Sequence, residues 1–273
     1  MLNSLSTGIS GMQNAQLQIN VIGDNIANIS TPGFKANRMT SEDSFVQTLA
    51  ARGNSQIQAG SGVNASSTGY DMANGSYTVT GVATDLYIGG NGFFTVKDAA
   101  GVQYATRAGA FVRNATTGVL ETSDGLAVQG FSDTNLSAAG SVTIDAATAP
   151  ASSATAKMTG FDIQTDGKIL VKMSDGTSFV RGQILLTNYR NPQALQRAGS
   201  NLFSGLSQAG AEPAGAPGTP GYGEIKANAL EGSNVDLTTE LTSLITTQRA
   251  FQANARMITT SDELLQEMIS LKR

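Results

Sequence analysis

Three aspartates are the residues whose type and spacing first suggest chemistry. Asp162, Asp166 and Asp175 lie close together in the sequence and could supply oxygen ligands to calcium. Their spacing does not match an EF-hand loop, and the last two each precede a glycine, as aspartates in turns do. Turn formation explains these residues better than metal binding, so we expect no metal site.

Pairs of carboxylates could instead serve as the acid and base of a glycosidase. The candidate pairs are Asp145 with Asp162 and Glu121 with Asp124. No aromatic platform for a sugar accompanies them, and the chain contains no Trp, no His and no Cys. The last two absences remove the commonest nucleophiles, proton shuttles and zinc ligands. We therefore expect no enzymatic activity, no catalytic residue and no cofactor.

The glycine-rich stretch Gly89–Gly92 resembles a phosphate-binding loop only superficially. It lacks the Gly-Lys-Ser/Thr ending of a P-loop and lies between two β-prone runs, which favours a turn. The net charge of −4 likewise predicts no nucleic-acid partner and no membrane partner. Charged residues make up only 14 % of the chain, against about a quarter in a typical soluble protein. Either subunits bury one another, or this is a low-charge extracellular protein such as a β-rich adhesin.

The two ends of the chain are the elements that organise the rest. Both carry apolar side chains at alternating steps of three and four, a repeat of about 3.5 residues that places one narrow seam on a helix. The first seam comprises Leu2, Leu5, Ile9, Met12, Gln16, Ile19 and Ile26, with Gly23 in register. The second comprises Leu237, Leu241, Leu244, Gln248, Phe251, Ile258, Leu265 and Ile269, with Ala255 and Asp262 in register. We interpret both as a self-assembly seam.

The first helix is expected to run from Leu2 to about Ile29, where Thr31-Pro32-Gly33 stops it. Asp24 is the only charged side chain between Met1 and Phe34, which favours burial among other helices over contact with a membrane surface. A plain intramolecular helical hairpin is the alternative. The N-terminus lacks the basic and apolar regions of a signal peptide, so we expect export without cleavage.

The region between the helices reads as antiparallel β structure. Asp-Gly pairs at 124–125, 166–167 and 175–176 each separate β-prone runs and suggest two-residue hairpins. The predicted fold class is α+β, with terminal helices forming a coiled-coil-like stalk around an intervening, mainly antiparallel β domain. The expected divisions are 1–35 plus 232–273 (helical assembly domain), 36–75 (connector with a short helix near Glu42–Leu49), 76–207 (β-rich domain, with 131–183 a reduced outer subdomain or loop insertion) and 208–231 (Gly/Pro-rich return linker).

Several motifs resemble those of the bacterial flagellar axial proteins, the rod and hook group. They are "NVIGDNIANISTPGFK" (Asn20–Lys35), "GGNGFFTV" (Gly89–Val96), "YATRAGAF" (Tyr104–Phe111), "NPQALQRAGSNLF" (Asn191–Phe203) and "ALEGSNVDLTTELTSLITTQRAFQANARMITTSDELLQ" (Ala229–Gln266). The residues at matching motif positions are Asn25, Asn28, Thr31, Gly33, Phe34, Gly92, Phe93, Phe94, Asn191, Pro192, Glu231, Gly232, Asn234, Gln248 and Arg249.

The stretches "ITTSDELLQ" and "VQGF" look more like hook protein, whereas the short stretch between Phe131 and Ile184 is nearer the length of a distal rod protein. We favour hook, with distal rod as the alternative. The resemblance implies a helical homopolymer that transmits motor torque outside the cell envelope. The rod alternative would lie in the periplasm and the outer-membrane ring region. The implied partners are neighbouring rod, hook-cap and hook–filament junction proteins and the type III export apparatus.

Overall fold

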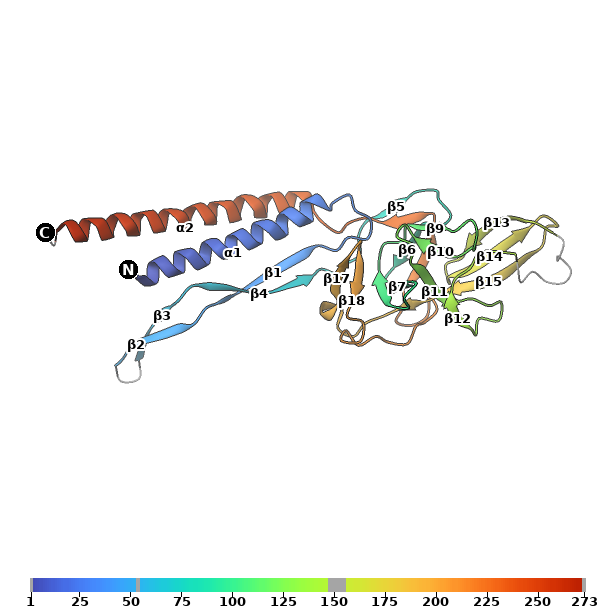
Figure 1. Cartoon of the computed structure of the whole chain (residues 1–273), viewed down its shortest axis with the longest axis horizontal. Coiled ribbons are helices and arrows are strands. Elements are labelled where there is room, and N and C mark those ends of the chain that lie inside the picture. Colours follow the sequence, from blue (N-terminus) through green and yellow to red (C-terminus); the bar gives the residue numbers. More distant parts are fainter. Residues whose placement is uncertain (1, 53–54, 147–155, 272–273) are drawn as a thin grey trace. The chain divides into compact units, whose positions relative to one another are not determined.

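The computed structural model describes residues 2–52, 55–146 and 156–271 (Figure 1). The chain divides into two compact units, and each is described by itself. Unit 1 comprises residues 1–29, 36–71 and 235–273, and unit 2 comprises residues 30–35 and 72–234. Unit 1 therefore contains both terminal helices together with most of the segment expected to be a connector.

Unit 1 is built on two antiparallel helices, α1 (Leu2–Ala27) and α2 (Leu237–Leu271), which lie side by side in Figure 1. Helix α1 ends slightly before the expected Ile29, ahead of the Thr31-Pro32-Gly33 stop. The Asp236 side chain caps α2, since its Oδ1 accepts a hydrogen bond from the Thr239 amide at 3.0 Å. Both terminal helices are as predicted; a coiled-coil stalk stays a prediction.

A long hairpin completes unit 1. Strand β1 (Asn37–Asp43) pairs antiparallel with β4 (Val63–Tyr70), and β2 (Val46–Arg52) pairs with β3 (Ser55–Gly60). The expected short helix near Glu42–Leu49 was therefore wrong. Its apolar spacing did fit one helical face, but so short a helix is marginal on its own, and pairing with the returning strand prevails.

Unit 2 holds the remaining strands, mostly in one antiparallel sheet with the order β13-β14-β15-β11-β7-β8-β18-β17. The strands are β5 (Tyr77–Val79), β6 (Leu86–Gly89), β7 (Phe93–Lys97), β8 (Gln103–Thr106), β9 (Phe111–Arg113), β10 (Leu120–Thr122), β11 (Ala127–Phe131), β12 (Ala139–Ser141), β13 (Met158–Ile163), β14 (Lys168–Met173), β15 (Ser178–Ile184), β16 (Leu186–Thr187), β17 (Gln196–Gly199), β18 (Leu202–Ser204), β19 (Glu224–Ala227) and β20 (Ala229–Glu231). A 3-10 turn, η2, spans Pro192–Ala194. The α+β class with a mainly antiparallel β domain is confirmed.

The Asp-Gly turns do connect neighbouring strands, but not as two-residue hairpins. Gly125, Gly167 and Gly176 have φ angles of 81°, 80° and 84°, and none of the preceding aspartates has a positive φ. Each glycine amide instead donates to the carbonyl three residues earlier, as from Gly167 to Gln164 at 2.9 Å. This is a type I turn followed by a left-handed glycine, so only the glycine supplies the positive φ angle.

One hydrophobic core runs through unit 2. Phe94 and Val96 of β7, Val171 of β14, Ile184 of β15 and Ile225 of β19 belong to the same cluster of buried side chains. The segment 131–183 thus adds strands to the common sheet and side chains to the common core. Within the expected return linker, 224–227 and 229–231 are strands β19 and β20. Most of the Ala/Ser/Thr tract at 145–156 lies outside the described residues.

Candidate functional site

The contact between the two helices of unit 1 uses small residues of α1. Gly8 and Ala15 are buried, and an added Cβ on Gly11 would lie 2.6 Å from Asn254 Nδ2. An added Cβ on Gly8 would lie 3.0 Å from Ile258 Cγ1. Glycine permits this close approach because it has no side chain. Gly8, Gly11 and Ala15 each lie one position before a predicted seam residue, namely Ile9, Met12 and Gln16.

The predicted seam is consequently left partly free within the monomer. On α1, Leu5, Met12, Ile19 and Ile26 are half-buried while Ile9, Gln16 and Gly23 are exposed; the Leu2 side chain lies outside the described part. On α2, Leu244, Phe251, Ala255, Ile258 and Leu265 are half-buried, whereas Leu237, Leu241, Gln248, Asp262 and Ile269 are exposed. The α2 seam is thus shared between the contact with α1 and solvent.

A group of amides ties the end of α1 to the start of the hairpin. Asn25 is 1 % exposed, and its Nδ2 donates to the Asn37 carbonyl at 2.9 Å while its Oδ1 accepts from the Asn37 amide at 2.8 Å. Asn25 Nδ2 also donates to Glu240 Oε1 at 3.1 Å, which brings in the first turn of α2. Asn37 Nδ2 donates to Asp24 Oδ2, and Asn28 Nδ2 to Asp24 Oδ1. Asn25 thus joins three segments that are distant in the sequence.

Asn25→Ala should lower the free energy of unfolding of unit 1 by about 1–3 kcal/mol, because it leaves the Asn37 amide and carbonyl without partners. Asn28→Ala is the matched control, since the Asn28 bonds are solvent-exposed. Urea unfolding of the full chain, followed by the helical circular dichroism signal, measures both. Equal midpoints for the two variants would contradict the role given to Asn25.

A buried polar cluster of unit 2 surrounds Glu231 at the end of β20. Lys35 Nζ lies 2.6 Å from Glu231 Oε1, and their side chains are 0 % and 1 % exposed. The Gly75 amide donates to the same oxygen at 2.9 Å, and Lys35 Nζ also donates to the Ala73 carbonyl at 2.7 Å. Arg107 NH1 reaches Glu231 Oε2 at 3.4 Å. One carboxylate therefore holds together three stretches of chain.

Arg107 completes this cluster as a second cation. Its NH2 group donates to the Gly90 carbonyl at 2.7 Å, and its guanidinium lies 5.2 Å from the centre of the Phe93 ring. Burial lowers the pKa of Arg107, and the neighbouring Glu231 carboxylate opposes that shift. The glycine-rich stretch considered as a phosphate-binding loop thus presents its Gly90 carbonyl to an arginine.

The Thr31–Lys35 segment docks beside the same cluster. The Gly33 amide donates to the Glu231 carbonyl at 2.7 Å, and Gly33 has a φ angle of 70°. Arg197 lies 4.2 Å above the Phe34 ring and donates to the Lys35 carbonyl at 2.8 Å. Asn201 Nδ2 donates to the Pro32 carbonyl at 2.9 Å. The segment that follows the first helix is therefore held firmly within unit 2.

The other motif residues mostly support this anchorage. The Gly232 amide donates to the Ser76 carbonyl at 2.7 Å, and Asn234 Nδ2 to the Ala73 carbonyl at 3.2 Å. Phe93 and Phe94 are buried, and Gly92 has a φ angle of 125°. Asn191 precedes the 3-10 turn that Pro192 begins, and Gln248 and Arg249 are exposed on α2. The sequence singled out Glu231 but not its partners Lys35 and Arg107, although both lie in the quoted motifs.

The aspartates considered for chemistry have structural partners. Asp162 pairs with Lys172, Asp166 with Lys168 at 2.7 Å, and Asp175 accepts from the Thr177 amide at 3.0 Å. Asp145 pairs with Arg181 at 2.7 Å, and Glu121 accepts from Asn114 Nδ2. In the described part of the chain, no three metal-binding side chains gather and no helix is long and apolar enough to cross a membrane.

Comparisons with known proteins match the chain along most of its length. Residues 5–35 match the family described as flagella basal body rod protein, residues 87–171 match the flagellar hook protein FlgE/F/G D1 domain, and residues 226–271 match the flagellar basal body rod FlgEFG protein C-terminal. The matched residues include Asn25 of the amide group, Lys35, Arg107 and Glu231 of the buried cluster, most of α1 and all of α2.

Full-length relatives resemble the chain from end to end. The flagellar basal-body rod protein FlgG of Bacillus subtilis is 38 % identical over 283 residues, covering 100 % of both chains. FlgG of Caulobacter vibrioides is 34 % identical over 99 % of this chain and 100 % of its own. The flagellar hook protein FlgE of Borreliella burgdorferi is 25 % identical over 443 residues, covering 100 % of both chains.

Proposed function

Since the chain belongs to the FlgE/F/G family of flagellar rod and hook proteins, we propose that it is a distal rod subunit of the flagellar basal body. The family is a structural one whose members polymerise next to other axial proteins of the flagellum. The proposal takes the rod alternative in preference to hook, which the motifs "ITTSDELLQ" and "VQGF" had favoured.

Aligned length is the observation that carries this proposal. The Bacillus subtilis rod protein aligns over 283 residues, close to the 273 residues of this chain. The alignment with the Borreliella burgdorferi hook protein needs 443 positions, because that hook protein contains sequence with no counterpart here. The described part of segment 131–183, where an outer domain was expected of a hook protein, belongs to the common sheet and the common core. The length of the chain therefore matches that of the rod relatives.

The partly exposed self-assembly seam of the two helices supports a role in assembly. Leu237, Leu241 and Ile269 of α2 are exposed in the monomer, as is Ile9 of α1. Burying apolar surface stabilises an assembly by about 25 cal/mol per Å² removed from water. We expect these side chains to contact helices of neighbouring copies in a tube, with rod neighbours and the export apparatus as further partners. The rod position lies in the periplasm and the outer-membrane ring region.

A deletion strain tests the choice between rod and hook. If the chain is the distal rod subunit, purified basal bodies from a strain lacking it should show a shortened shaft and no hook, because the hook is built on the finished rod. Restoring the gene on a plasmid should restore both structures. A full-length shaft that lacks only the hook would overturn the proposal and make this chain the hook subunit.

A further inference from the structure

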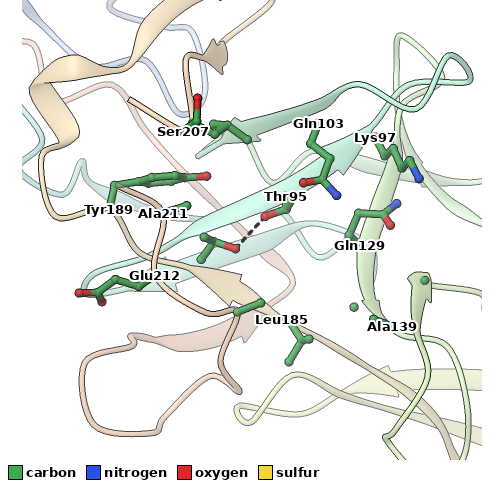
Figure 2. A pocket seen from close by; sticks show the side chains of 15 residues that line it. Thr95, Lys97, Gln103, Gln129, Ala139, Leu185, Tyr189, Ser207, Ala211 and Glu212 are labelled. Atoms are coloured by element: carbon green, nitrogen blue, oxygen red, sulfur yellow. Dashed lines mark hydrogen bonds between the residues drawn. The ribbon is translucent and has the colours of Figure 1, made fainter. Parts of the chain in front are cut away.

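A groove of about 630 Å³ lies in unit 2 on the outer face of β7 and β8 (Figure 2). Thr95 and Lys97 of β7 line it, alternating with Phe94 and Val96, which point into the core. The segment 205–215 forms one wall by pairing with residues 186–191, as in the bond from the Glu212 amide to the Asn188 carbonyl. Strands β11 and β12 form the opposite wall.

Tyr189 is the unusual residue of this groove. Its side chain is 3 % exposed, and its ring packs edge-on against Phe93 with the ring centres 5.4 Å apart. The hydroxyl has no hydrogen-bond partner among the described residues, and Figure 2 shows it directed toward the middle of the groove. A buried hydroxyl without a partner destabilises the fold, because it has lost its hydrogen bonds to water. Burial raises the pKa of Tyr189 to about 12, so the hydroxyl stays protonated and can donate to an incoming acceptor.

The rest of the groove indicates the kind of occupant. The Thr95 and Thr187 hydroxyls bond one another at 2.9 Å across the floor, and the Gln103 side-chain amide is exposed beside them. The charged groups, Lys97 and Glu212, lie on opposite sides of this uncharged floor (Figure 2). Amides and hydroxyls suit a peptide backbone, and the uncharged middle excludes an ionised side chain there. The groove fits an extended, uncharged segment.

Unit 2 itself contains a segment that is extended, exposed and uncharged. Strand β5 pairs only with β20 among the described strands, so its other edge is open. Tyr77, Val79 and Val82 are 48 %, 67 % and 50 % exposed, and residues 72–84 contain no charged side chain. An exposed strand edge that carries apolar residues and no charge favours pairing with another chain.

We propose that residues Tyr77–Val82 of one copy lie in the Tyr189 groove of the next copy. A backbone carbonyl of the inserted segment accepts a hydrogen bond from the Tyr189 hydroxyl. The inference rests on the proposed function, because it needs a polymer of this chain. Groove and strand are different surfaces of one unit, so the contact is head-to-tail. A head-to-tail contact builds an open helical filament when its rotation does not close into a ring.

Paired cysteines test this contact cleanly because the native chain has none. Val79→Cys is combined with Ala139→Cys or with Ala211→Cys, exposed positions on the two walls of the groove. Basal bodies from cells making each double variant are isolated and treated with a mild oxidant. A ladder of dimers and longer oligomers is expected from at least one pair and from neither single variant.

Val112→Cys with the same wall positions is the matched control, since Val112 is 59 % exposed on β9, outside the proposed segment. Equal ladders from the Val79 and Val112 pairs, or no ladder from either Val79 pair, would overturn the contact. Antibody labelling of the same basal bodies reads the proposed function separately. A labelled rod without crosslinks would rule out only the proposed contact. An unlabelled rod would rule out the proposed function.

Tyr189→Phe tests the hydrogen bond while retaining the ring. The soluble monomer should unfold at the same temperature as the unmodified chain or slightly higher, because the hydroxyl has no partner there. Assembled rods should nevertheless dissociate at lower urea concentration. Rods that dissociate at the same urea concentration as the unmodified ones would remove Tyr189 from the contact.

Discussion

Lys35→Met is expected to lower the free energy of unfolding of unit 2 by about 3–5 kcal/mol, the usual cost of removing one partner from a buried ion pair. Lys35 is 0 % exposed, and its loss leaves the Glu231 carboxylate buried with the Gly75 amide and the more distant Arg107. The Ala73 carbonyl loses its charged donor as well. Guanidinium unfolding of the full chain, followed by tyrosine fluorescence of the β structure, measures the change.

Lys168→Met is the matched control for that prediction. Lys168 pairs with Asp166 at 2.7 Å, but the two side chains are 36 % and 39 % exposed. Exposed ion pairs contribute about 0–1 kcal/mol, so this variant should unfold almost like the unmodified chain. If Lys35→Met lowered the free energy of unfolding as little as Lys168→Met, the Glu231 cluster would not be a major source of the stability of unit 2.

Gly33→Ala is expected to destabilise unit 2 by about 3 kcal/mol, the sum of left-handed backbone strain and overpacking. Gly33 has a φ angle of 70°, and an added Cβ would lie 2.5 Å from the Ala108 backbone nitrogen. The backbone must shift to admit the methyl group, which strains the Gly33 bond to the Glu231 carbonyl.

Gly125→Ala is the matched control, which measures the cost of left-handed backbone strain without overpacking. Gly125 has a φ angle of 81°, but an added Cβ there has no neighbour within 4 Å. Only the strain of about 1–2 kcal/mol should remain. Thermal unfolding of both variants beside the unmodified chain gives the difference. Equal losses of stability would mean that Gly33 is required for its conformation alone and not for close docking.

The helices could be predicted because their apolar spacing repeats over many turns. The face that α1 turns toward α2 could not, since Gly8, Gly11 and Ala15 form a stripe beside the larger Ile and Met side chains. Hydrophobicity favours the larger side chains, whereas close approach of two backbones favours the smaller ones. The buried stripe of α1 therefore lies one residue from the predicted seam, and the seam is left partly exposed for other contacts.

Long-range pairing accounts for what the sequence did not show. The helix expected near Glu42–Leu49 gave way to strands because β1 pairs with the distant β4, with Asp43 opposite Val63, and β2 pairs with β3 in the same hairpin. Lys35 and Glu231 are 196 residues apart, so no local pattern could join them. Glu231 and Gly33 were found through motif resemblance, whereas their role follows only from the structure.

The most direct test of the central proposal is to locate the chain within the flagellum. An epitope inserted between Thr116 and Thr117, exposed residues of the β9–β10 turn, is introduced into the chromosomal gene. Swimming of the cells shows that the tagged chain is exported and assembled. Electron microscopy of gold-labelled hook–basal bodies should then show label along the straight shaft between the motor rings and the hook. Label along the curved segment outside the envelope would contradict the rod proposal and assign the chain to the hook.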